Sequence, residues 1–291
     1  MLACFPETPE TYFNVKLIMD KLGLNALDFG RSADGKMQMI MVGKSGGKPT
    51  YNCPVGDGRA PFLEKCNLYT LGQIAQHHQN YVAAGRPHKK QAEYQNFVNE
   101  HLLSGDEDEL VLSKLYPASL HSNLGAVDKI IEHIERHGFE TKEIGEAWMV
   151  QFLKDNNIVR KQKQGRPGLD GNQARIFTKA ADKLSQRIEE EGWDVFTKVQ
   201  PCVVALRALD KVIQDCFGQD LKPSAHTSIK TFLRLYRDIP GLSVTPKVHF
   251  IDQHVLQFLD MEAPPGVGLG FYSEQATEAS HFDFKVSRHF L

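Results

Sequence analysis

The chain has 291 residues, 41% hydrophobic and 24% charged, with a formal net charge of −2. This balance fits a globular protein of one large or two modest domains, and the near-neutral charge excludes attraction of nucleic acid over the whole surface. No apolar run approaches the roughly 18 residues of a membrane span, and the N-terminus carries no signal-peptide pattern. We therefore expect an intracellular protein with no membrane partner, nuclear if it acts on DNA.

Residues 1–66 are expected to form a short α/β segment. Thr8 and Pro9 are typical of a helix start, and a short strand is expected to run into a turn at Asp34 and Gly35. The apolar run 37–42 fits either a strand or a buried helix, because periodicity does not separate the two over so few residues.

A loop rich in glycine and proline is predicted at residues 43–61. Gly43 to Lys48 resembles the phosphate-binding pattern G-x-x-x-x-G-K-[ST], but it has one residue fewer between the glycines, and Pro49 stands where serine or threonine is required. No nucleotide cofactor is expected. Cys53 and Cys66 lack the C-x-x-C spacing of zinc ligands, so zinc is not expected either.

Residues 67–243 are predicted to be a helical domain. The expected helices span 71–84, 89–103, 120–137, 144–156, 172–191, 193–217 and 224–237. Pro201 is expected to kink or split one of them. Residues 244–291 are expected to add closing helices, the first beginning at a Thr245 cap with Pro246 in its first turn. The fold class predicted is mainly α.

Asp34 is the first candidate site residue. A carboxylate at the end of a strand can hold a metal ion, although aspartate before glycine is also the ordinary composition of a turn.

Lys247, His249 and His254 form the second group. The histidines are five residues apart, too far round an α-helix to bind one metal together, whereas zinc proteases place theirs four apart. On an otherwise apolar helix they are expected to be partly buried hydrogen-bonding groups.

Glu274, Glu278 and His281 form the third group. Their spacing places all three on one helical face, and Glu278 with His281 has the Glu-x-x-His spacing of metal-binding helices. A solvated face is the alternative.

A fourth group is a basic loop with a glycine–proline turn, which could approach a phosphate backbone or simply be solvated. Its members are Arg160, Lys161, Lys163 and Arg166.

Five blocks of the chain, in order, resemble transposase-like proteins of animal cut-and-paste DNA elements. They are residues 32–54 (SADGKMQMIMVGKSGGKPTYNCP), 71–103, 116–134 (YPASLHSNLGAVDKIIEHI), 166–184 and 245–284, the last with TPKVHFIDQHV and GLGFYSEQATEASHFDF. The resemblance implies a partial RNase H-like α/β core of the DDE type, interrupted by a large helical insertion. It also implies DNA as partner and Mg²⁺ or Mn²⁺ as cofactor if the protein is active.

In such a core, two metal ions held by three carboxylates cleave and join DNA strands. The resemblance gives Asp34 the role of the second carboxylate and Glu278 that of the third, with Glu274 as its rival and His281 as the reason to prefer Glu278. Lys247, His249 and His254 would then lie near the metals or the DNA phosphates.

Two features depart from the family pattern. The first carboxylate, expected upstream of Asp34, has no counterpart, and Gly56 stands where the family has a second cysteine after Cys53-Pro54. We therefore expect a truncated protein that is inactive alone and has no zinc site in this loop. The alternatives are a non-enzymatic helical scaffold for DNA, a protein partner or a second copy of the chain, and a hydrolase with a metal on His249, His254 and Glu278.

Overall fold

The computed structural model describes residues 11–23, 31–32, 35–45, 49–62, 64–163 and 166–272. The described chain is mainly helical, as predicted from the sequence, and its strands are short. It divides into two compact units. Unit 1 comprises Met1–Ala118 with Tyr272–Leu291, and unit 2 comprises Ser119–Phe271.

Short helices and long connections make up unit 1. The elements are α1 (Tyr12–Lys21), β1 (Arg31–Ser32), α2 (Gly35–Met41), α3 (Leu71–Ala83), the 3₁₀ helix η2 (His88–Tyr94), α4 (Val111–Lys114) and β2 (Leu115–Tyr116). The run 37–42, ambiguous in the sequence, is helical up to Met41, the last residue of α2. Helix α1 begins after a Thr11 cap, and the expected start at Thr8 and Pro9 lies outside the described residues.

The capping of α3 explains why its start could be predicted. The Thr70 hydroxyl accepts a hydrogen bond from the Gln73 N–H, and the Gln73 side chain accepts one from the Thr70 N–H. This reciprocal capping box satisfies two donors that a helix start would otherwise leave without partners.

The helix predicted at 89–103 is wrong beyond its first residues. Gln95 and Asn96 have positive φ angles of 50° and 65°, which end η2. Phe97 then forms an antiparallel bridge with Lys44 and is fully buried. A tertiary contact therefore overrides the local helical pattern.

Strands β1 and β2 pair in parallel. Arg31 lies opposite Leu115, and Ser32 lies opposite Tyr116. Parallel pairing requires a long crossover between the strands. Here the crossover contains α2, α3, η2 and α4.

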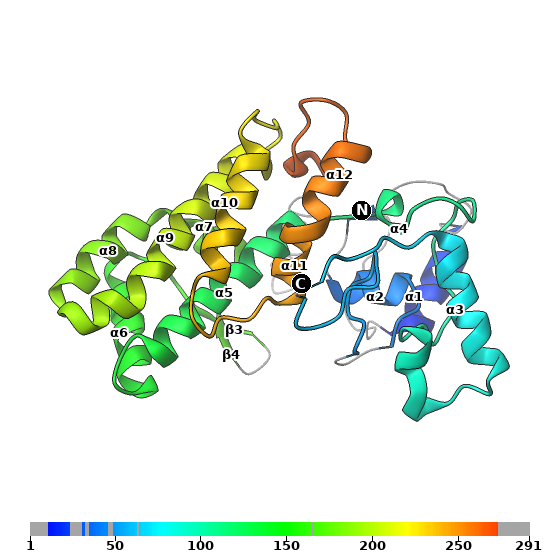
Figure 1. The fold of residues 1–291 in the computed structure, drawn as a ribbon, viewed down its shortest axis with the longest axis horizontal. Helices are drawn as coiled ribbons and strands as arrows, with labels where there is room; N and C mark the ends of the chain where they lie inside the picture. Colours follow the sequence, from blue (N-terminus) through cyan, green and yellow to red (C-terminus); the bar gives the residue numbers. More distant parts are fainter. Residues whose placement is uncertain are drawn as a thin grey trace, which may run out of the picture. The chain divides into compact units, whose positions relative to one another are not determined.

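Unit 2 is a helical assembly around α9, which packs against α5, α7, α8 and α10 (Figure 1). The elements are α5 (Ser119–His137), α6 (Lys142–Asp155), β3 (Lys161–Lys163), β4 (Arg166–Gly168), α7 (Gly171–Lys179), α8 (Ala181–Glu190), α9 (Trp193–Cys216), α10 (Ala225–Arg237), α11 (Pro246–His249), the π-helix η3 (Phe250–His254), α12 (Val255–Met261) and the 3₁₀ helix η4 (Leu269–Tyr272), whose last residue belongs to unit 1.

Three details of unit 2 differ from the prediction. Helix α9 continues through Pro201 rather than splitting. The helix expected at 172–191 is two helices that meet at Ala180. The basic loop is an antiparallel hairpin of β3 and β4.

In the part of the chain that the structure describes, none of the helices has the length and apolar character needed to cross a membrane.

Candidate functional site

Tyr116, at the end of β2, is contacted by three separate segments of unit 1. Its backbone pairs with Ser32 of β1, and its carbonyl accepts a 2.9 Å hydrogen bond from the side-chain nitrogen of Gln38, which is 1% exposed. Its ring meets the ring of Tyr272 edge-on, with centroids 4.9 Å apart. We call these four residues the Tyr116 junction.

Four carboxylate and histidine candidates lie outside the described residues. They are Asp34, Glu274, Glu278 and His281. In the sequence, Asp34 comes two positions after Ser32 and Glu274 two positions after Tyr272. The Tyr116 junction thus contains the described residues that flank both.

Cys53 and Cys66 lie together in the interior of unit 1, at 0% and 2% exposure. Their sulfur atoms are 4.0 Å apart, too far for a disulfide, and the Gly58 N–H donates to Cys66 Sγ over 3.1 Å. A Cβ on Gly56 would lie only 2.5 Å from that sulfur. Cys66 thus fills the space beside Gly56, and the loop expected to hold a single cysteine brings two thiols together.

Lys44 is buried beside the two thiols. Its ammonium donates to the carbonyl oxygens of Tyr51, Cys53 and Gly56, at 3.2, 2.6 and 3.5 Å. It also lies over the ring of Phe97, 4.8 Å from the centroid, in a cation–π contact.

Burial shifts the pKa values of this group. It lowers the pKa of Lys44 to about 8, against the opposing effect of the nearby thiols. For Cys53, burial alone would raise the pKa, but the hydrogen bond with Cys66 and the charge of Lys44 outweigh it and hold that pKa below its ordinary value. The hydrogen bond with Cys66 and the charge of Lys44 therefore stabilise the ionised form of Cys53 against the cost of burial.

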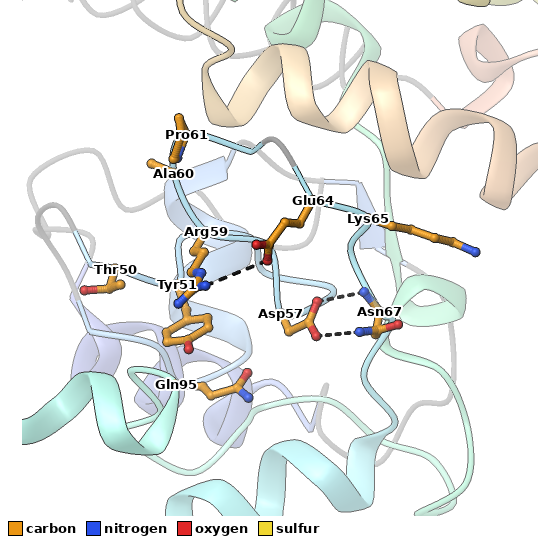
Figure 2. Close-up of a pocket in the computed structure, with 11 residues that line it drawn as sticks. Thr50, Tyr51, Asp57, Arg59, Ala60, Pro61, Glu64, Lys65, Asn67 and Gln95 are labelled. Atoms are coloured by element: carbon orange, nitrogen blue, oxygen red, sulfur yellow. Dashed lines mark hydrogen bonds and ion pairs between the residues drawn. The ribbon is translucent and has the colours of Figure 1, made fainter.

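A cavity of about 580 Å³ borders the same loop, as Figure 2 shows. Two hydrogen bonds of 2.7 and 2.8 Å join the Asp57 carboxylate to the backbone and side chain of Asn67. Arg59 reaches Glu64 across the cavity at 3.8 Å. These contacts are made between lining residues and tie residues 57–59 to residues 64–67.

His249 and His254 are both fully buried, and their Nε2 atoms are 3.2 Å apart. This corrects the expectation that five residues place them too far round the helix. In an α-helix that spacing turns by about 140° beyond one full turn, but the segment Phe250–His254 is a π-helix. Its hydrogen bonds link residues five apart, so the two imidazoles lie one above the other.

The contact made by Nδ1 of His254 determines which ring nitrogen carries the proton. Nδ1 lies 2.9 Å from the side-chain oxygen of Gln257, which can only accept. Nδ1 therefore carries the proton, and the lone pair of Nε2 points towards His249. This is the arrangement in which histidines bind metals.

The basic candidates have different surroundings. Lys247 is exposed, and its aliphatic stem packs closely on Gly125. Arg160 forms an ion pair with Glu135 at 2.7 Å, both mostly covered, and Lys161 pairs with Asp170 at 2.9 Å. Burial raises the pKa of Glu135, against the effect of Arg160.

The side chains of Lys163 and Arg166 lie outside what the structure describes, although their backbones pair in the hairpin. Lys247 presents its charge to solvent, and among the described residues no carboxylate forms an ion pair with it.

Sequence reasoning missed Gln38, Lys44 and Tyr116, and it considered Cys66 with Cys53 only to set the pair aside because of its spacing. In the sequence, Gly56 gives no sign that the Cys66 side chain lies beside it. Gln38 resembles an ordinary polar exception in the apolar run 37–42. One signal was available: TPKVHFIDQHV places both histidines in an otherwise apolar segment.

The sequence matches no model of a known protein family, and no curated protein matches it either.

Proposed function

We propose that this chain is derived from a transposable element and carries part of a DDE-type core that acts on DNA strands with Mg²⁺ or Mn²⁺. Asp34 and Glu274 would hold the metal. Bound there, the ions would activate the attacking hydroxyl and stabilise the departing oxygen of the DNA backbone. The observation that carries the proposal is the Tyr116 junction.

The small number of residues between the Tyr116 junction and each carboxylate favours Asp34 and Glu274. A polypeptide advances at most about 3.6 Å per residue, so two residues span about 7 Å or less. Asp34 follows Ser32 by two residues, and Glu274 follows Tyr272 by two residues. Ser32 and Tyr272 both contact Tyr116. Glu278 is six residues beyond Tyr272, so its tether is three times as long. We therefore favour Glu274 over Glu278 as the third carboxylate.

One pair of two-residue parallel strands, β1 with β2, is the feature that favours an α/β core beside Asp34. The aspartate follows a strand that pairs in parallel with β2, as expected at the carboxyl edge of a parallel sheet, where ligands bind in α/β folds. The compact helical unit 2, Ser119–Phe271, would contain most of the insertion, which the resemblance places at residues 67–243. Its exposed Lys247 is the residue we propose to contact DNA phosphate.

Manganese binding tests the proposal without requiring turnover. We expect the full chain to bind Mn²⁺, measured by the loss of the free-ion electron paramagnetic resonance signal. Asp34→Asn and Glu274→Gln should each weaken binding by about tenfold or more, because each removes one charged oxygen ligand. Glu278→Gln is the matched control and should leave the affinity unchanged.

The reverse pattern, with binding lost in Glu278→Gln and kept in Glu274→Gln, would rule out the junction as the metal site. If the chain nicks supercoiled DNA with Mn²⁺, activity that survives in Glu274→Gln would also contradict the proposal. DNA binding that is unchanged in Lys247→Ala would remove that lysine from the interface.

A further inference from the structure

Two pairs of buried side chains outside the carboxylate site have the chemistry of metal ligands: Cys53 with Cys66 in unit 1, and His249 with His254 in unit 2. Thiolate sulfur and imidazole nitrogen are the ligands that zinc prefers, whereas Mg²⁺ and Mn²⁺ prefer oxygen. Neither pair is therefore suited to the catalytic ion of the proposed function.

We propose that both pairs are zinc-ligand pairs and that the chain carries structural zinc.

The sulfur pair has the dimensions of one edge of a zinc tetrahedron. With Zn–S bonds of about 2.3 Å, two sulfurs bound to one ion lie about 3.8 Å apart. The observed separation of Cys53 Sγ and Cys66 Sγ is 4.0 Å. Gly56 makes this possible, because a Cβ there would lie only 2.5 Å from the Cys66 sulfur and would displace it.

The surroundings of the sulfur pair suit an anionic ligand set. Lys44 supplies a buried positive charge and is fixed by three carbonyls of the same loop. The Gly58 N–H donates to Cys66 Sγ. Backbone donors and a nearby cation are the outer contacts that stabilise metal-bound thiolates.

The histidine pair has the dimensions of another such edge. Two nitrogens on zinc, at about 2.0 Å each, lie about 3.3 Å apart. The Nε2 atoms of His249 and His254 are 3.2 Å apart. The hydrogen bond from His254 Nδ1 to Gln257 fixes the tautomer that leaves Nε2 able to bind a metal. The π turn, which costs regular helical hydrogen bonding, has its explanation in this geometry.

The experiment measures zinc in the full chain after purification without chelators and dialysis. Zinc should be retained at one ion per chain or more, by mass spectrometry. X-ray absorption of the wild-type protein should show sulfur neighbours at about 2.3 Å and nitrogen neighbours at about 2.0 Å. This measurement does not depend on whether any variant folds.

Variants then assign the ligands. Cys53→Ser, Cys66→Ser, His249→Asn and His254→Asn should each lower the zinc content or weaken its binding, with circular dichroism to confirm that the helices remain. The matched controls are Cys202→Ser and His226→Asn. Cys202 is a buried thiol whose pKa burial raises to about 12, and His226 pairs with Asp260 at 2.8 Å. Both controls should retain zinc.

A wild-type protein that holds no zinc would overturn the proposal, as would a zinc shell without sulfur or without nitrogen. Zinc content unchanged in folded Cys66→Ser would overturn the role given to that thiol. These outcomes are independent of Mn²⁺ binding at the carboxylates, so either proposal can fail while the other stands.

Discussion

Gly145→Ala should destabilise unit 2 by about 3 kcal/mol, although helix propensity alone predicts a gain of about 1 kcal/mol from the same change. The reason is the close contact of α6 with α5. A Cβ on Gly145 would lie 2.2 Å from the carbonyl oxygen of Glu135 and 2.8 Å from its carbon. Both atoms belong to the backbone, so the two helices must move apart to admit the methyl group.

Urea unfolding followed by tryptophan fluorescence measures this effect, because Trp148 and Trp193 both belong to unit 2. Gly218→Ala is the matched control: a Cβ there meets nothing closer than the Asp220 oxygen at 4.0 Å. It should change the free energy of unfolding by less than about 0.5 kcal/mol. A Gly145→Ala protein as stable as the wild type would show that α5 and α6 are not packed this closely.

Asp215→Ala is expected to cost about 3 kcal/mol as well. The Asp215 carboxylate, 3% exposed, joins α9 to the start of α10. It accepts hydrogen bonds from Lys211 at 2.6 Å, Ser224 at 2.7 Å and Ser228 at 2.5 Å. Alanine removes every one of these bonds and leaves the buried Ser228 hydroxyl without this acceptor. Asp182→Ala is the control, because that carboxylate is 80% exposed in its pair with Arg207 and should contribute less than about 1 kcal/mol.

The loss of stability caused by Asp215→Ala should depend on pH. Burial alone would raise the pKa of Asp215, but the bonds from Lys211, Ser228 and Ser224 hold it below its ordinary value of 3.8. A carboxylate with a depressed pKa contributes stability that is present above the unfolded pKa and is lost as pH falls through the folded pKa. The difference between wild type and Asp215→Ala should therefore be constant near neutral pH and shrink below about pH 4. A difference that grows on acidification would contradict this account of Asp215.

Sequence patterns located the helices whose ends carry their own signals. Helix α3 has the Thr70–Gln73 capping box, and α5 shows a continuous apolar face, so both begin and end within one residue of the predicted limits. Such signals are local and need no knowledge of the fold. The prediction of a helix at 89–103 was wrong because Phe97 forms a bridge with Lys44, a partner more than fifty residues away.

The short distance within each proposed ligand pair could not be predicted from the sequence, for geometric reasons. The spacing of His249 and His254 prevents them from binding one metal ion together only if the helix is a regular α-helix. The π turn that brings them together has no simple sequence signal. Cys66 lies beside Cys53 only because the intervening loop folds back and Gly56 leaves room for its sulfur. A fixed spacing rule cannot represent either case.

The central claim is that Asp34 and Glu274 bind a divalent metal beside Tyr116. Iron-directed cleavage tests it most directly: Fe²⁺ replaces Mg²⁺, and ascorbate with peroxide generates radicals that cut the nearby backbone. The account predicts cuts close to residues 34, 116 and 274, all suppressed by excess Mg²⁺ and lost in Glu274→Gln. Cuts that spare residue 116, or that persist in Glu274→Gln and disappear in Glu278→Gln, would contradict it.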